Sequence, residues 1–146
     1  GLSNLLLGAI NLDEALCDAG VPGLKVLPSG PFPPNPSELL GSAAMETVLG
    51  SLRDLSDIII LDAPPIIAVT DACILAPKLD GSILVVRLGA GNRDMTLRAK
   101  SSLENVGARI LGVVVNDVRP ESGYGSYYYY YYYYYDKVKS SQGPNE

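Results

Sequence analysis

The chain has 146 residues, of which 47% are hydrophobic, and its formal net charge is −5. This length and apolar content suit one domain with its own core, whereas the acidic balance excludes a general binder of nucleic-acid phosphate backbones. Histidine is absent and the two cysteines form no CxxC motif, which excludes His-based catalytic triads and zinc sites in this chain.

The first 36 residues predict short elements followed by a stiff loop. Residues 1–16 place leucines at helical spacing, with Ser3 as a plausible cap, and a short helical turn is expected over residues 12–17. Residues 24–27 predict a short strand. The loop at residues 28–36 holds five of the eleven prolines and therefore excludes both helix and central strand.

A longer helix is predicted to start directly after this loop. Asn35 is a good N-cap, Pro36 suits the first helical position, and Glu38 completes a capping box. We expect the helix to run to about Leu52, with one apolar stripe packed against a sheet.

Residues 57–62 read DIIILD, an apolar strand with an acid at its carboxyl end. Such a run typically fills the centre of a parallel sheet, and ligands bind at the carboxyl ends of such strands. Asp62 there could hold a magnesium ion beside a nucleotide phosphate, which is the Walker B pattern. Taken alone the pattern is weak, because many apolar strands end in an Asp that only begins a turn.

Asp71 has two interpretations of equal weight. Thr70 can cap a helix over residues 71–76, so Asp71 would be a first-turn charge favoured by the helix dipole. Alternatively, Asp71 belongs to a network of water and magnesium around Asp62.

The next segments alternate between strand and helix. Strands are predicted at residues 82–88 and 110–115, separated by a helix at 94–106 that Gly107 closes. With residues 24–27 and 57–62 this gives four strands alternating with helices, so we expect a parallel sheet. Asn116 follows the last strand, where an Asn is usually a turn residue, although its amide could also read an adenine base.

The tail contains nine consecutive tyrosines at residues 127–135, preceded by Tyr124. Every face of such a run is alike, so it cannot be an amphipathic strand or helix. The bland interpretation is a low-complexity segment that self-associates. A nucleic-acid stacking surface is disfavoured because the tail lacks the neighbouring positive charge that it would need.

As a set, these motifs resemble the bacterial tyrosine kinases, relatives of the MinD/ParA deviant Walker ATPases. The resemblance rests on DIIILDAPP with the later Thr70-Asp71, on LPSGPFPPNPSELL at residues 27–40, on LGVVVNDV at residues 111–118, and on the tyrosine cluster. It implies an α/β fold with a P-loop NTPase-like parallel sheet flanked by helices. It also implies ATP and Mg²⁺ as cofactors.

The resemblance assigns roles to particular residues. Asp62 would bind the metal and act as the base or orienting group, Asp71 would support it, and Asn116 would contact adenine. The tail would be the kinase's own substrate, phosphorylated in trans by a neighbouring subunit. The tyrosines expected to be modified are Tyr124, Tyr127, Tyr128, Tyr129, Tyr130, Tyr131, Tyr132, Tyr133, Tyr134 and Tyr135.

The motif GxxxxGK[ST] does not occur in the 146 residues. We therefore expect residues 1–120 to be the C-terminal part of a kinase domain that is incomplete at its N-terminus and inactive alone, and residues 121–146 to be a disordered Tyr-rich tail. The resemblance places the strand of the phosphate loop next to the strand that ends in Asp62. Without that strand, open apolar edges should make the chain fold poorly or associate.

The family resemblance also implies partners and a location. These are a homo-oligomeric ring, a membrane-anchored activator or chain-length regulator in the same or a separate chain, and a tyrosine phosphatase, with no nucleic acid. No apolar run approaches the roughly 20 residues of a membrane span, so we expect a cytoplasmic protein at the inner face of the plasma membrane. Its activity would regulate capsular or exopolysaccharide synthesis and export.

Two other functions remain open. A MinD/ParA-like ATPase shares the Walker B and base-reading positions but has no reason to end in ten tyrosines. A catalytically inactive interaction module is favoured by the absence of the phosphate loop.

Overall fold

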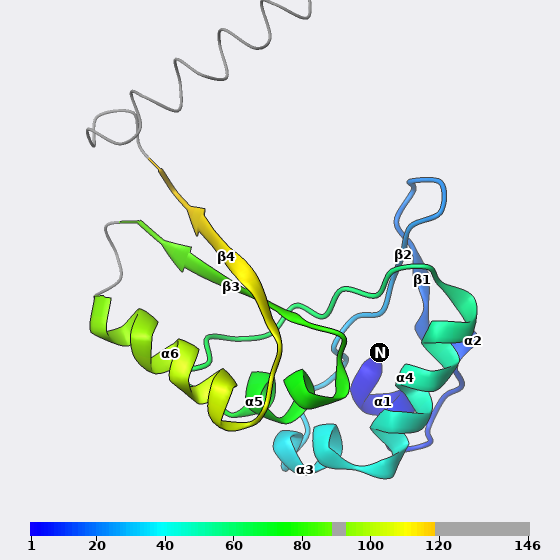
Figure 1. Ribbon diagram of the computed structural model, residues 1–146. Coiled ribbons are helices and arrows are strands. Elements are labelled where there is room, and N and C mark those ends of the chain that lie inside the picture. The colour runs from blue at the N-terminus through cyan, green and yellow to red at the C-terminus, as the bar shows by residue number, and fades with distance from the viewer. Residues whose placement is uncertain (89–92, 119–146) are drawn as a thin grey trace, which may run out of the picture.

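The computed structural model describes residues 1–88 and 93–118, and its elements are shown in Figure 1. The α-helices are α1 (Leu2–Leu6), α2 (Leu12–Ala15), α3 (Pro36–Gly41), α4 (Ala43–Leu55), α5 (Asp71–Leu75) and α6 (Arg93–Asn105), and a 3₁₀ turn, η1, spans Ala76–Lys78. The strands are β1 (Cys17–Asp18), β2 (Lys25–Val26), β3 (Ser82–Arg87) and β4 (Ile110–Asn116). The tyrosine tail, and with it the predicted boundary at residue 120, lies outside the described residues.

Strands β3 and β4 pair in parallel, with Ser82 opposite Ile110 and Arg87 opposite Asn116. Helix α6 connects them and buries Ala99 and Leu103. Val106, which the apolar spacing also predicts to point inward, is 36% exposed. The helix ends as predicted at Gly107, whose φ is +74°, and the Ala108 N–H donates to the Leu103 carbonyl. This is the Schellman arrangement that favours glycine at its C′ position. The predicted strand–helix–strand unit is confirmed.

The prediction of a four-stranded parallel sheet is wrong for the described residues. Strand β2, within the predicted strand at residues 24–27, pairs antiparallel with β1 in a separate two-stranded ribbon. The reason is the connection, because six residues can close an antiparallel hairpin but not the crossover that a parallel pair requires. The parallel sheet of the described residues therefore has two strands.

The segment at residues 57–62 was expected to be a buried central strand, and this is also wrong. It belongs to the long connection from α4 to α5 and has no strand partner among the described residues (Figure 1). Its side chains still alternate, since Ile59 and Leu61 are half-buried while Ile58 and Ile60 are 78% and 87% exposed. A strand is held by backbone hydrogen bonds to a neighbour, and no described segment supplies that neighbour.

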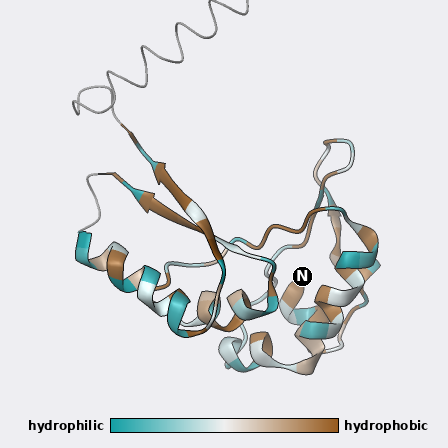
Figure 2. Cartoon of the chain, viewed as in Figure 1, coloured by the Kyte–Doolittle hydropathy of each residue, from teal (hydrophilic) through white to brown (hydrophobic). Residues whose placement is uncertain are grey.

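The apolar face of β3 is open as well. Ile83 and Val85 are 59% and 61% exposed, whereas the alternate positions Leu84 and Val86 are half-buried. Helices α5 and α6 lie on one side of the strand pair in Figure 1. Figure 2 shows hydrophobic colour along β3, β4 and the trace between α4 and α5. The strand predicted at residues 82–88 therefore forms, with one half-buried face and one exposed face.

The main core lies where α1, α4 and α5 meet. Its buried members are Leu6, Met45, Val48, Leu49 and Leu75, and Leu61 packs against them. Helix α1 is held against the proline-rich loop because the Leu2 and Ser3 N–H groups donate to the carbonyls of Pro28 and Ser29. Gly1 rather than Ser3 precedes this helix, so the predicted cap is wrong; Ser3 is buried inside the first turn.

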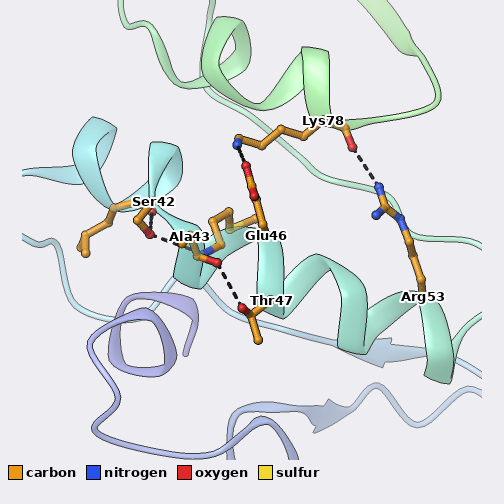
Figure 3. Close-up of polar contacts among 8 residues, drawn as sticks. Ser42, Ala43, Glu46, Thr47, Arg53 and Lys78 are labelled. Atoms are coloured by element: carbon orange, nitrogen blue, oxygen red, sulfur yellow. Dashed lines mark hydrogen bonds and ion pairs between the residues drawn. The ribbon is translucent and has the colours of Figure 1, made fainter.

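The helix predicted from Asn35 to Leu52 is divided in two at Ser42. The Ser42 backbone is extended, its hydroxyl donates to the Leu39 carbonyl, and its Oγ accepts from the Met45 N–H (Figure 3). A serine can satisfy the end of one helix and the start of the next, which makes the break favourable. Asn35 makes no side-chain cap and instead donates through Nδ2 to Glu38.

Replacing Ser42 by Ala should lower the free energy of unfolding by about 1 kcal/mol, because α4 loses its N-cap. Urea titration followed by circular dichroism would measure this. Ser51→Ala on the same helix is the matched control, since the Ser51 hydroxyl only donates to the Thr47 carbonyl one turn earlier. Equal midpoints for the two variants would mean that the break does not depend on the cap.

Among residues 1–88 and 93–118, no helix combines the length and apolar character needed to cross a membrane.

Candidate functional site

Asp62 stands at the end of the extended 57–62 segment with its side chain exposed. Leu61, beside it, packs against the core and so fixes this end of the segment. A magnesium ion in a nucleotide site usually keeps several waters and takes one or two protein carboxylates together with phosphate oxygens. An exposed carboxylate on an anchored backbone fits that role.

No group of three or more metal-ligating side chains gathers within the described part of the chain. A metal held mainly by protein ligands therefore has no candidate there.

Asp71 is the first residue of α5 and is half-buried. The predicted cap is absent, because the Thr70 side chain does not accept from the first turn of α5. The Thr70 hydroxyl instead lies 3.2 Å from the Ser37 hydroxyl at the start of α3. This contact links the start of α3 to the Thr70-Asp71 pair, which the sequence did not indicate.

The carboxyl ends of β3 and β4 form a polar cluster around Asn116. The Arg87 guanidinium contacts Oδ2 of Asp117 through both Nε and Nη2 at 2.7 Å. The Asp117 N–H donates to Oδ1 of Asn116 at 2.8 Å, and the Leu88 N–H continues the ladder to the Asn116 carbonyl. Asn116 is exposed, so its amide can meet a ligand.

Asp117 is the residue of this cluster that sequence reasoning missed. Its φ is +57°, the one positive value among the described non-glycine residues. Aspartate tolerates this conformation better than most residues, and the ion pair with Arg87 helps to hold it. The Arg87 side chain is 65% exposed and also pairs with Asp117. The contact depends on the strand register, which places Arg87 opposite Asn116 and becomes visible only in the structure.

Within the described residues, no hydrogen bond or ion pair joins Asp62, Asp71 and Asn116 to one another. They come from three elements: the extended segment, the start of α5 and the end of β4. The candidate site is therefore three separate polar positions, of which only the Asn116 cluster is tied together by hydrogen bonds.

Two carboxyl groups with lowered pKa lie on other elements. The Gly20 N–H and then Lys25 lower the pKa of Asp18 in the β1–β2 ribbon. Lys78 lowers the pKa of Glu46, and the Arg53 guanidinium donates to the Lys78 carbonyl (Figure 3). Both acids are exposed, and neither is a candidate catalytic group. The Glu46–Lys78 ion pair connects α4 to η1, and the Asp18–Lys25 ion pair joins β1 to β2.

The fold and these positions define an α/β domain with a parallel strand pair and polar groups at the strand ends. Known kinase domains share this architecture. The kinase domain of the Escherichia coli tyrosine kinase ETK matches with a TM-score of 0.79 at 34% identity, over 84% of this chain and 48% of that one. The VpsO kinase domain matches with a TM-score of 0.76 at 33% identity, over 82% and 59%.

Sequence relatives agree. The tyrosine-protein kinase CpsD of Streptococcus agalactiae is 39% identical over 128 residues, and YwqD of Bacillus subtilis is 37% identical over 129. Each alignment covers 87% of this chain, but the chain spans only 56% and 54% of the two relatives. No protein-family model matches the chain. Over the compared residues, the chain is homologous to bacterial tyrosine-protein kinases.

Proposed function

We propose that this chain is the part of a protein tyrosine kinase that carries the metal-binding acid, the base contact and the substrate tail. The supporting observation is its 37–39% identity to named tyrosine-protein kinases over 87% of its length, together with ten tyrosines near its end. The kinase uses ATP and Mg²⁺ and transfers phosphate to the tyrosines of residues 124–135. Residues 1–120 form the kinase part and residues 121–146 the substrate segment.

The chain's residues have distinct tasks in this reaction. Asp62 binds the metal and orients or deprotonates the tyrosine hydroxyl, and Asp71 supports the water around it. Asn116 contacts adenine through its amide. Bound Mg²⁺ neutralises charge that develops on the transferred phosphoryl group.

The tail reacts in trans, within a homo-oligomeric ring. Each phosphate adds about −1.5 to −2 charge at neutral pH, so several of them make the tails repel one another and favour release of the ring. A membrane-anchored activator starts the cycle at the inner face of the membrane, and a tyrosine phosphatase resets it. The cycle regulates capsular or exopolysaccharide synthesis.

The phosphate-binding motif GxxxxGK[ST] is not among the 146 residues, and this favours a second candidate, an inactive interaction module. In the kinase proposal, residues outside this chain provide that loop and the chain is inactive alone. The MinD/ParA-like ATPase remains the other enzyme alternative.

Mass spectrometry distinguishes the three functions. The complete kinase, meaning this chain with its upstream coding sequence, is incubated with ATP and Mg²⁺ while phosphate release is followed in parallel. Tyrosine phosphates on residues 124–135 are the expected result. Phosphate release with an unmodified tail would instead indicate the ATPase, and neither product would indicate the inactive module.

A further inference from the structure

An ion pair through one carboxylate oxygen reinforces the pairing at the ends of β3 and β4. Arg87 holds Oδ2 of Asp117 with two nitrogens of its planar guanidinium, each at 2.7 Å. Such a fork restrains direction as well as distance. It spans the strand pair at the register position where Arg87 lies opposite Asn116.

The same aspartate also orients the Asn116 amide. The Asp117 backbone has a φ of +57°, and its N–H donates to Oδ1 of Asn116 at 2.8 Å. Only the oxygen of the carboxamide can accept this bond, so the assignment of oxygen and nitrogen is determined. Because the amide is planar, fixing Oδ1 also fixes the direction in which Nδ2 donates.

We propose that Arg87 and Asp117 are positioning residues that set the orientation of Asn116 for adenine. This inference rests on the proposed function, in which Asn116 contacts the base. The oriented Nδ2 donates to a ring nitrogen, and the second lone pair of Oδ1 accepts from the exocyclic amine of adenine. Guanine carries a carbonyl in place of that amine, so a fixed amide favours ATP over GTP.

The Arg87–Asp117 ion pair orients the Asn116 amide and adds little to the stability of the fold. The Arg87 side chain is 65% exposed and that of Asp117 is 33% exposed. Ion pairs in water contribute little to folding. The effect of breaking this pair should therefore appear in nucleotide selectivity and leave the unfolding midpoint unchanged.

The test uses Arg87→Gln and Asp117→Gly in the complete kinase. Glycine keeps the left-handed backbone at position 117 and removes only the carboxylate. Each variant should raise the KM for ATP about 3- to 10-fold, the cost of weakening one hydrogen bond, with kcat unchanged. The preference for ATP over GTP should fall by the same factor. Arg87→Lys, which keeps the charge but not the fork, should give an intermediate loss.

Two further variants test whether the effect on the KM comes from the Arg87–Asp117 pair and acts through Asn116. Glu104→Gln breaks the comparable exposed ion pair between Lys100 and Glu104 on α6 and should leave the KM unchanged. In an Asn116→Ala background, Arg87→Gln should cause no additional change, since the amide to be oriented is gone.

The outcomes separate this inference from the function on which it rests. If Asn116→Ala weakens ATP binding while the Arg87 and Asp117 variants do not, the positioning role is wrong and the base contact stands. If Asn116→Ala leaves both ATP affinity and selectivity unchanged, the base contact is wrong and the positioning role fails with it.

Discussion

Asp62→Asn should reduce phosphorylation of the tyrosine tail by about 10²- to 10⁴-fold in the complete kinase. Asparagine keeps the size of the side chain but removes the negative charge that binds Mg²⁺ and the basicity that a tyrosine hydroxyl requires. The backbone should be unaffected, because the Asp62 side chain is exposed and the packing of Leu61 fixes this part of the chain. Mass spectrometry of residues 124–135 after a fixed incubation with ATP measures the loss.

Two other acids provide comparisons for this variant. Asp57→Asn makes the same chemical change at the opposite end of the extended segment, where the side chain is also exposed, and should leave the rate unchanged. Asp71→Asn should cost an intermediate amount, about 10- to 100-fold, if Asp71 acts through the water around the metal. A larger loss for Asp71→Asn than for Asp62→Asn would reverse the roles proposed for these two acids.

The sequence predicts elements well where the signals are local. Helix α6 and strands β3 and β4 lie within a residue of their expected bounds, since apolar spacing and the glycine at position 107 act over a few residues. The division at Ser42 was missed because the predicted helix pattern continues across it, and only the two hydrogen bonds of the Ser42 side chain reveal the break.

Pairing is harder to predict because it depends on residues distant in sequence. The apolar run at residues 57–62 reads as a central strand, but a strand also needs a neighbour, and the described residues provide none. Ile58 and Ile60 of this run are exposed. In the candidate site, Asn116 was predicted from its place at a strand end, whereas Asp117 gains its role only from the register that brings Arg87 across to it.

Met45→Ala should lower the free energy of unfolding of the complete kinase by about 2–5 kcal/mol. Met45 is 2% exposed and lies with Val48 and Leu49 on the face of α4 that packs against α1 and α5. Alanine would leave a cavity that the surrounding helices can fill only in part. That loss is a large fraction of the roughly 5–15 kcal/mol that holds a typical domain together.

The other methionine provides a matched control for this substitution. Met95 is on α6 and 48% exposed, so Met95→Ala should change stability by less than about 0.5 kcal/mol. Urea titration with circular dichroism compares the two variants directly. The core where α1, α4 and α5 meet also holds Leu61, next to Asp62, so Met45→Ala should loosen the position of the proposed metal ligand. If both variants unfold at the same urea concentration, this core does not stabilise the domain, and the anchoring of Asp62 must come from elsewhere in the kinase.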